Sequence, residues 1–444
     1  MDKLNSEKGG ITLFVIVALL FAVTILIVTY WRSTNYQVSV LQSEQRIKEI
    51  YGKDVNNVNE IYDEVSSVPQ KGPTGKPLVN KVTISDYVTG TNFEGEDRYG
   101  NPITIPVGFK VAQDSGADVT QGIVIEDNDI QTDGNGNQRG NQYVWIPTGT
   151  IYTDTAMTPA NAKTIVAGRY EFANGTNNYI NEDGTTTTTA PAKGTPILKQ
   201  RLSNYLIQPT DITYYSENMI KTATNKQIVV GGYYYEVPEY REGVEASGLS
   251  GQNRTAYSLS SFANSVADNR GFYIARYEAS WGTGDKVKSR VSSGTPLTTN
   301  DTRTNGQLWN FITEIDAAEF CNNLYSNVES DLMNSYAWDT AIVYIQTFSG
   351  DEDYSYQTSL NIGSNPSNTG INNDEVCKIN DIASNGWEWT TEYSTHKQNL
   401  NNIAFPCVLR GGFYVHENQW AGNRWDYYAT YIIEYVTFRP ILYL

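Results

Sequence analysis

"INDIASNGWEWTTEYS", residues 379–394, decides the expected fold together with two later stretches, "VLRGGFY" at 408–414 and "VTFRPIL" at 436–442. Gly411 and Gly412 follow the first three residues of the second stretch, which we expect to end a strand. Glycine has no Cβ, so it permits a positive φ or a close approach of two backbones. We therefore expect a turn or a close backbone approach directly after this strand.

The same stretches suggest a buried ion pair. Arg439 stands beside Pro440 near the end of the chain, and a guanidinium that is buried needs a carboxylate partner. Glu388, which lies between Trp387 and Trp389, is the candidate partner. The alternative is that Arg439 is a surface residue.

Four phrases come earlier in the chain: "QYVWIP" (142–147), "GFYIARYEAS" (271–280), "WNFITEIDAAEFCNNL" (309–324) and "AWDTAIVYI" (337–345). In this order, and with the stretches above, they resemble the formylglycine-generating enzyme and sulfatase-modifying-factor superfamily. The resemblance implies an α+β fold, with a C-type-lectin-like domain over residues 79–444 and a long insertion at about 152–270. It also implies a framework role for Trp387, Glu388, Trp389, Arg410, Gly411, Gly412 and Arg439.

The resembled enzymes carry two cysteines shortly after the glycine pair. Carried onto this chain, these positions fall at His416 and Ala421, so neither holds a thiol. A thiolate is the nucleophile and metal ligand that such an oxidation needs. The chain has only two histidines, so a metal site of several histidines is not expected either. We therefore expect no enzyme activity and no catalytic cofactor, and a degenerate enzyme is the third class of function.

Residues 411–444 contain many large rings, interleaved with Asn, Asp and Gly. Tyr and Trp offer a large contact area with few rotatable bonds and a polar tip, as in antibody combining sites. A dense exposed cluster of rings is typical of a surface that meets a ligand. The candidate ligand-binding residues are Phe413, Val415, His416, Asn418, Trp420, Trp425, Tyr427, Tyr428, Tyr431, Ile433 and Tyr435.

This segment resembles the mutable carboxyl-terminal segment of variable proteins of diversity-generating retroelements, which share the lectin-like fold. In that system adenines are randomised, so Asn codons change into codons for Tyr, Ile and several other residues. The resemblance implies diversification at Tyr427, Tyr428, Tyr431, Ile432, Ile433 and Tyr435. Two alternatives stay open: the rings form a core of the fold, or the surface has a fixed specificity.

"ITLFVIVALLFAVTILIVTYW", residues 11–31, contains no charged residue. A helix of this length, at about 1.5 Å per residue, spans the roughly 30 Å hydrocarbon core of a membrane. A single-pass anchor is one interpretation. The other is a prepilin-like leader, because the preceding "SEKGG" resembles that of type IV prepilins and pseudopilins, in which cleavage would separate Gly10 from Ile11. The Glu that this family usually has at the fifth mature position is Val15 here.

Residues 32–66 carry apolar side chains at steps of three and four, among them Ile47, Tyr51 and Val55. This spacing predicts an amphipathic helix, either a stalk or a helix packed on the domain. Residues 67–78 hold closely spaced Pro and Gly, which cannot continue a helix. We expect a linker there.

Composition limits the kinds of partner and the kinds of cysteine site that we expect. The net charge is −17 and the sequence has no cluster of Lys and Arg, so nucleic acid is not expected as a partner. The three cysteines, Cys321, Cys377 and Cys407, form no C-x-x-C motif, so a zinc ribbon is not expected. A disulfide between Cys377 and Cys407 is an open alternative, whereas Cys321 reads as a small buried hydrophobe.

The acidic stretch "DNDIQTDGNGN", residues 127–137, invites a calcium interpretation. It lacks the EF-hand spacing and the terminal Glu, so we expect a turn built by Asp and Asn, with structural calcium as the open alternative. Elsewhere, short strands are expected between Gly, Asn and Asp turns, and helices at about 314–325 and 337–347. Thr313 is the expected N-cap of the first helix, with Asp316 three residues on.

These patterns together predict a surface-displayed, adhesin-like protein that binds a ligand. Its carboxyl-terminal domain would lie outside the cell, anchored in a membrane through residues 11–31 or linked to a pilus. The expected partner is an extracellular protein or a glycan. The alternative is a pilin- or pseudopilin-like structural subunit, whose non-catalytic lectin-like domain packs against other pilin-like subunits.

Overall fold

The computed structural model describes residues 70–79, 87–204, 220–221, 228–230, 233–235, 259–322, 324–360, 363–393, 407–415, 418–427 and 431–444. The predicted membrane segment 11–31, the predicted stalk 32–66 and the predicted processing site at Gly10 and Ile11 lie outside these residues. Two candidate ligand-binding residues, His416 and Tyr428, lie outside them as well.

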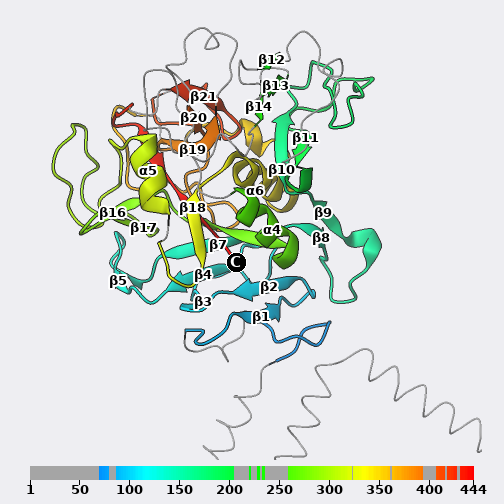
Figure 1. Cartoon of the computed structure of the whole chain (residues 1–444), viewed down its shortest axis with the longest axis horizontal. Coiled ribbons are helices and arrows are strands. Elements are labelled where there is room, and N and C mark those ends of the chain that lie inside the picture. Colours follow the sequence, from blue (N-terminus) through cyan, green and yellow to red (C-terminus); the bar gives the residue numbers. More distant parts are fainter. Residues whose placement is uncertain are drawn as a thin grey trace, which may run out of the picture.

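A six-stranded antiparallel sheet forms the centre of the described structure (Figure 1). In spatial order its strands are β18 (Glu329–Leu332), β23 (Pro440–Tyr443), β15 (Gly271–Ala275), β7 (Gln142–Pro147), β4 (Val124–Asp127) and β3 (Phe109–Val111). The last strand of the chain, β23, therefore lies inside this sheet, between β18 and β15. The sheet joins segments that are far apart in the sequence.

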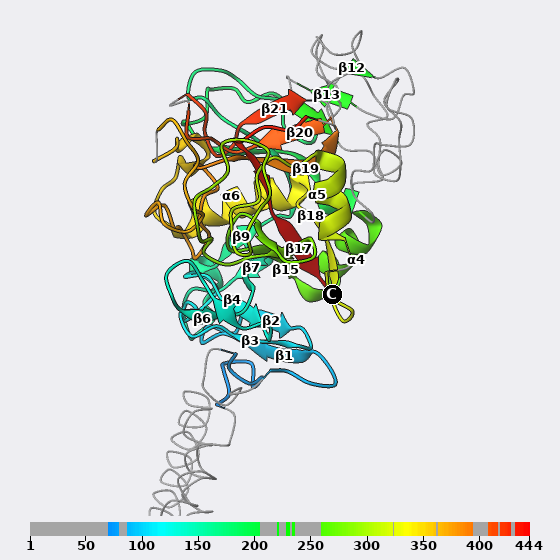
Figure 2. The same cartoon turned by 90° about the vertical axis from the view of Figure 1, so that its left-hand side faces the viewer.

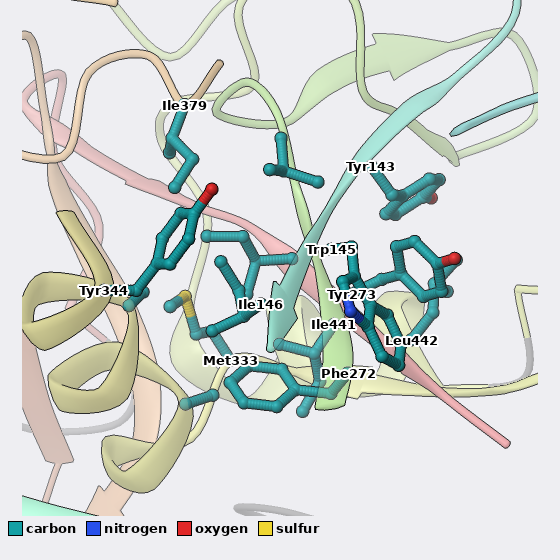
Figure 3. Close-up of a cluster of buried hydrophobic side chains, with 14 of the residues drawn as sticks. Tyr143, Trp145, Ile146, Phe272, Tyr273, Met333, Tyr344, Ile379, Ile441 and Leu442 are labelled. Carbon is teal, nitrogen blue, oxygen red and sulfur yellow. The ribbon is translucent and has the colours of Figure 1, made fainter. Parts of the chain in front are cut away.

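Large apolar side chains on these strands explain why the sheet is buried. In the middle of the sheet, Tyr273 of β15 lies opposite Trp145 of β7 on one side and Leu442 of β23 on the other. The rings of Trp145 and Tyr273 have centroids 4.8 Å apart. Figure 3 shows these side chains in the main core, together with Met333 and Tyr344. Such packing removes large ring surfaces from water, which is the main source of stability.

A second, four-stranded sheet holds the carboxyl-terminal segment. Its strands, in spatial order, are β21 (Arg424–Tyr427), β20 (Cys407–Arg410), β19 (Trp387–Tyr393) and β22 (Val436–Phe438). The pairing of β19 with β22 is parallel and the other two pairings are antiparallel. Figures 1 and 2 both place β19, β20 and β21 at the end of the molecule opposite to β1 and β2.

Smaller sheets make up the rest of the strands. The two-stranded ones are β1 (Phe93–Glu96) with β2 (Pro102–Ile105), β5 (Gln131–Thr132) with β6 (Gln138–Arg139), β8 (Gly149–Ile151) with β9 (Lys163–Ile165), β10 (Gly168–Phe172) with β11 (Pro196–Arg201), and β16 (Ser280–Gly282) with β17 (Lys286–Lys288). A three-stranded sheet contains β12 (Ile220–Lys221), β13 (Ile228–Val230) and β14 (Tyr233–Tyr235).

Three α-helices lie within the described residues: α4 (Leu259–Asn269), α5 (Glu314–Cys321) and α6 (Ser335–Phe348). The Thr313 side chain accepts a hydrogen bond of 3.0 Å from the backbone N–H of Asp316, so the predicted N-cap of α5 is confirmed. The helix ends at Cys321, earlier than predicted. Asn334 caps α6 in the same way, through a 2.9 Å bond from the N–H of Ala337.

The expected α+β class is wrong, because the described structure is mostly β, with 30% strand and 14% helix. Gly, Asn and Asp recur every few residues, and such turn residues favour short strands that return on themselves. None of the helices in the described ranges combines the length and the apolar character that crossing a membrane requires.

Candidate ligand-binding surface

The edge strand β21 presents part of the aromatic segment. Trp425 and Tyr427 are two residues apart on this strand, so their side chains lie on the same face. Leu409 and Cys407 of β20 lie opposite them in the register, and both are buried. Among the described strands, β21 pairs with β20 alone, so its other edge has no strand partner there.

Trp387 on β19 supports the ring of Trp425 from below. The two indoles are stacked, with centroids 5.9 Å apart and planes 15° apart. Trp425 is 46% exposed, whereas Trp387 is 5% exposed. Trp387 also contacts Phe413 at 4.1 Å and Tyr435 at 5.6 Å between ring centroids. It is thus the buried centre of an aromatic cluster whose outer members reach solvent.

Tyr427, Tyr431 and Tyr435 continue this cluster along the terminal segment. The rings of Tyr427 and Tyr431 are stacked, with centroids 3.8 Å apart. The hydroxyls of Tyr431 and Tyr435 are joined by a hydrogen bond of 2.8 Å. Partial burial and the neighbouring tyrosine hydroxyls raise the pKa of Tyr431, so the hydroxyl keeps its proton. We call Trp425, Tyr427, Tyr431 and Tyr435 the aromatic surface.

Phe413 does not belong to this surface. It is 3% exposed and lies between Trp387 and Tyr435, with its ring 5.0 Å from that of Tyr435. The following ring, Tyr414, is buried too. All residues from 407 to 414 are buried, so the prediction that Phe413 contacts a ligand is replaced by a role in the core.

The other candidate residues are spread over different environments. Val415 is 43% exposed and Asn418 is exposed, whereas Trp420 and Ile433 are half-buried. Trp420 packs against Tyr356, with ring centroids 5.3 Å apart, and is not joined to the aromatic surface by any ring contact among the described residues. Ile432 is 41% exposed. It was expected to be a diversified position but was not among the candidate ligand-binding residues. Its position among the terminal rings was the available signal.

The glycine pair has the role that the sequence predicts. Gly411 has a φ of 83°, and a Cβ there would lie 2.7 Å from the carbonyl oxygen of Ile382. A Cβ on Gly412 would lie 2.3 Å from the carbonyl oxygen of Ala383. Both positions therefore need glycine, one for its backbone conformation and both for the close approach of another chain segment.

The expected ion pair between Arg439 and Glu388 is confirmed. Nε of Arg439 donates to Oε2 of Glu388 at 2.6 Å, and neither side chain is exposed. The same guanidinium donates to the backbone carbonyls of Ala275 and Asn380. Arg439 thereby ties β19 of the smaller sheet to the end of β15 in the main sheet.

A second buried ionic network lies behind β21. Arg410 donates to Asp339 at 2.5 Å and to Glu392 at 3.1 Å. Arg424 contacts the same two carboxylates, at 2.6 Å and 3.0 Å. Arg169 of β10 forms an ion pair with Glu392 as well. Burial alone would raise the pKa of Glu392, but the three positive charges outweigh it and lower this pKa to about 2.

These buried ion pairs hold in place the strand that carries part of the aromatic surface. Arg424 belongs to the same short strand as Trp425 and Tyr427, so the buried network fixes the strand that carries the two rings. Charge-assisted hydrogen bonds are about twice as strong as neutral ones. The arrangement can therefore hold aromatic groups in place for contact with another molecule.

The three cysteines are free, so the disulfide considered between Cys377 and Cys407 is not formed. Cys407 is buried, and its thiol lies 3.7 Å from Oε2 of Glu314. Burial raises the pKa of the Cys407 thiol, and the neighbouring Glu314 adds to the effect. A protonated buried thiol is a poor nucleophile.

The acidic stretch 127–137 forms the expected turn. Oδ1 of Asp133 accepts from the backbone N–H groups of Asn135 at 3.0 Å and Asn137 at 2.8 Å. Asp127 uses its carboxylate for Asn141 and Tyr325. Across the described ranges, no group of three or more His, Cys, Asp and Glu side chains is placed to hold a metal ion.

No family model matches the sequence, and no curated protein matches it. The resemblances to the formylglycine-generating enzyme superfamily and to prepilins therefore have no support from a family model. Several solved structures are similar to the chain at low identity.

One of these structures is Treponema denticola variable protein 1, at 14% identity over 39% of this chain and 96% of that chain, with a TM-score of 0.27. Two others are variants of the major tropism determinant. The M1 variant is 12% identical over 76% of this chain and 83% of its own, with a TM-score of 0.26. The I1 variant is 11% identical over 80% and 96%, with a TM-score of 0.24.

Proposed function

We propose that this chain is a ligand-binding, adhesin-like protein that contacts its partner through the aromatic surface. The observation that carries the proposal is the stack of exposed Trp425 on buried Trp387. Exposed rings that are already held in place lose little conformational freedom on binding, which favours affinity. Trp and Tyr are also the residues that most often dominate the binding energy of interfaces.

The distribution of exposed apolar side chains supports this location. Six large hydrophobic side chains are exposed in the described structure; one of them, Trp425, belongs to the aromatic surface, and another, Ile432, directly follows Tyr431 of that surface in the sequence. Single exposed hydrophobic residues are common on any protein, whereas a group near half-buried tyrosines is typical of an interaction surface. The partner that suits such a surface is an extracellular protein or a glycan.

A finer proposal is that a retroelement diversifies this surface. Tyr431, Ile432 and Tyr435 have residue types that adenine randomisation produces from Asn codons, and they are exposed or half-buried. The framework residues Gly411 and Arg410 are buried, so they could not change without damage to the fold. This separation between a changeable exterior and a constrained interior is what diversification requires.

The binding proposal is tested by labelled protein on glycan arrays and on intact bacterial cells, with Trp425→Ala as the variant. Ile130→Ala is the matched control, because Ile130 is 41% exposed and directly precedes β5, which lies away from β21 (Figure 1). We expect Trp425→Ala to lose binding and Ile130→Ala to keep it. Equal binding by both variants would refute the role of the aromatic surface.

The diversification proposal has a separate genetic test. We expect a near-copy of the bases that encode residues 411–444 close to the gene, with adenines at the Tyr and Ile codons, and a reverse-transcriptase gene beside it. If the neighbourhood contains neither, the surface has a fixed specificity, and the binding proposal stands or falls on its own assay.

A further inference from the structure

A polar cavity of about 180 Å³ lies where the β5–β6 hairpin meets the end of β15 and the loop at 370–380. Three arginines and three carboxylates line it: Arg139, Arg276, Arg290, Asp114, Asp133 and Glu375. A water molecule takes about 30 Å³ in the liquid, so the cavity has room for a small solute. Figures 1 and 2 place the hairpin away from β21, so this cavity is separate from the aromatic surface.

Arg276 is the first of two buried cations at this cavity. It is 3% exposed, and its Nη1 donates to Asp114 Oδ2 at 2.7 Å and to Gln142 Oε1 at 2.8 Å. Its Nη2 donates to Glu375 Oε2 at 2.6 Å. Its Nε–H is buried and meets no acceptor among the described residues. A buried donor without an acceptor is costly, and a bound acceptor would relieve that cost.

Arg290, a second arginine of the cavity lining, repeats this arrangement. It is also 3% exposed, and Nη1 donates to the carbonyl of Arg139 at 3.1 Å. Nη2 donates to Asn141 Oδ1 at 2.8 Å and to Asp129 Oδ2 at 3.1 Å. Its Nε–H is likewise buried, without an acceptor in the part of the chain that the structure describes.

Two of the carboxylates at the cavity, Asp114 and Glu375, are ionised. Burial would raise the pKa values of Asp114 and Glu375, but the charge and hydrogen bonds of Arg276 outweigh it and lower both. Oδ1 of Asp114 is buried and accepts no hydrogen bond from the described residues. The cavity therefore combines spare donors on cations with a spare acceptor on an anion.

This balance of charge selects the kind of solute that fits. A simple anion would face the three carboxylates of the lining, and a simple cation would face the three guanidinium groups, in each case with like-charge repulsion. We propose that the cavity binds a small zwitterion the size of a short α-amino acid. Its carboxylate would lie toward Arg276 and Arg290, and its ammonium group toward Asp114.

The proposal is tested with the full-length chain by isothermal titration calorimetry. Glycine and L-alanine are the zwitterionic probes, acetate and methylammonium carry one of the two charges each, and glucose is the neutral polar probe. We expect saturable heats with the zwitterions and binding weaker by about tenfold or more for each single-charge probe.

Two variants remove one charge each from the more accessible part of the lining. Asp114→Asn acts on a side chain that is 38% exposed, and Arg139→Gln acts on a half-buried one. Each is expected to weaken zwitterion binding by about tenfold. Glu94→Gln, at a side chain 71% exposed on β1, should change nothing. Zwitterions that give no saturable heat at millimolar concentration, or glucose or a single-charge probe that binds as well as glycine, would overturn the proposal.

Discussion

Trp425 lies on Trp387 with the two ring planes 15° apart, so an exposed ring rests directly on a buried one. Trp387 in turn contacts Phe413 and Tyr435. The exposed Trp425 and the buried rings of Trp387 and Phe413 are therefore parts of one aromatic cluster. A change at Trp425 and a change at Trp387 should have different consequences.

We predict that Trp425→Ala lowers the free energy of unfolding by about 1 kcal/mol, the usual worth of one aromatic pair. Trp387→Ala should cost about 3–5 kcal/mol, because it removes a large ring from the core. Urea unfolding of both variants measures the difference. Equal losses would mean that Trp425 is a core residue and not a contact residue.

The ion pair of Arg439 and Glu388 predicts a strong loss when one partner is removed. Glu388→Gln should destabilise the protein by about 3–5 kcal/mol, because the Arg439 charge stays buried. Glu388→Leu and Arg439→Met should each cause a comparable loss alone, and the double variant that combines these two changes should recover part of it. Thermal unfolding of the single and double variants gives the coupling between the two residues, and independent, additive losses would rule it out.

Glu392 predicts a loss of stability in acid. Its pKa falls from 4.5 to about 2 in the folded state, so folding favours its ionised form. The resulting stabilisation is present above pH 4.5 and is lost as the pH falls through about 2. Glu392→Gln should cost on the order of 3 kcal/mol at pH 7, with a smaller difference at pH 2. Denaturant unfolding at both pH values measures this narrowing.

Asp374 predicts the opposite dependence of stability on pH, a loss as the pH rises. Burial and the neighbouring charge of Asp381 raise its pKa from 3.8 to about 7. The folded state then holds this proton more tightly than the unfolded chain, so stability falls as the pH rises from about 4 to 7. Asp374→Asn should flatten this decrease and be more stable than the original protein at pH 8. The exposed change Asp301→Asn serves as the control and should keep the original slope.

The substitution Gly412→Ala is predicted to destabilise the protein by a steric clash alone, because Gly412 does not have a positive φ. A Cβ there would lie 2.3 Å from the carbonyl oxygen of Ala383, so Gly412→Ala should destabilise by more than about 2 kcal/mol. Gly284→Ala has open space but a φ of 80°, and should cost about 1 kcal/mol through backbone strain alone. Chemical denaturation ranks the two variants, and the reverse order would contradict the close approach at Gly412.

The sequence predicted the features that depend on local chemistry. Thr313 caps α5 because a hydroxyl can accept from the N–H three residues on, whatever the fold around it. The pairing of Arg439 with Glu388 was also predictable, because a buried charge needs a partner and few carboxylates lie in the same phrases. The turn at Asp133 was predictable because an Asp side chain can accept hydrogen bonds from backbone N–H groups a few residues on.

The features that depend on distant segments were not predictable. Phe413 is an aromatic residue of the same segment as the exposed Trp425, yet Trp387 and Tyr435 cover it. The sequence does not show which rings will contact one another. The mostly β character has the same origin, because antiparallel partners such as β15 and β23 come from segments that are far apart in the sequence. The polar cavity gave no signal, since its arginines and carboxylates come from segments that are unremarkable alone.

Because β23 lies between β18 and β15, the main sheet is complete only if the preceding terminal segment is translated in the correct reading frame. This strand follows residues 411–435 in the sequence, so it cannot join the main sheet until that stretch has been translated. A nonsense codon or a frameshift in that stretch would delete β22 and β23, and would leave Glu388 without Arg439. We expect such products not to fold, whereas substitutions at Trp425 or Ile432 would leave β23 intact.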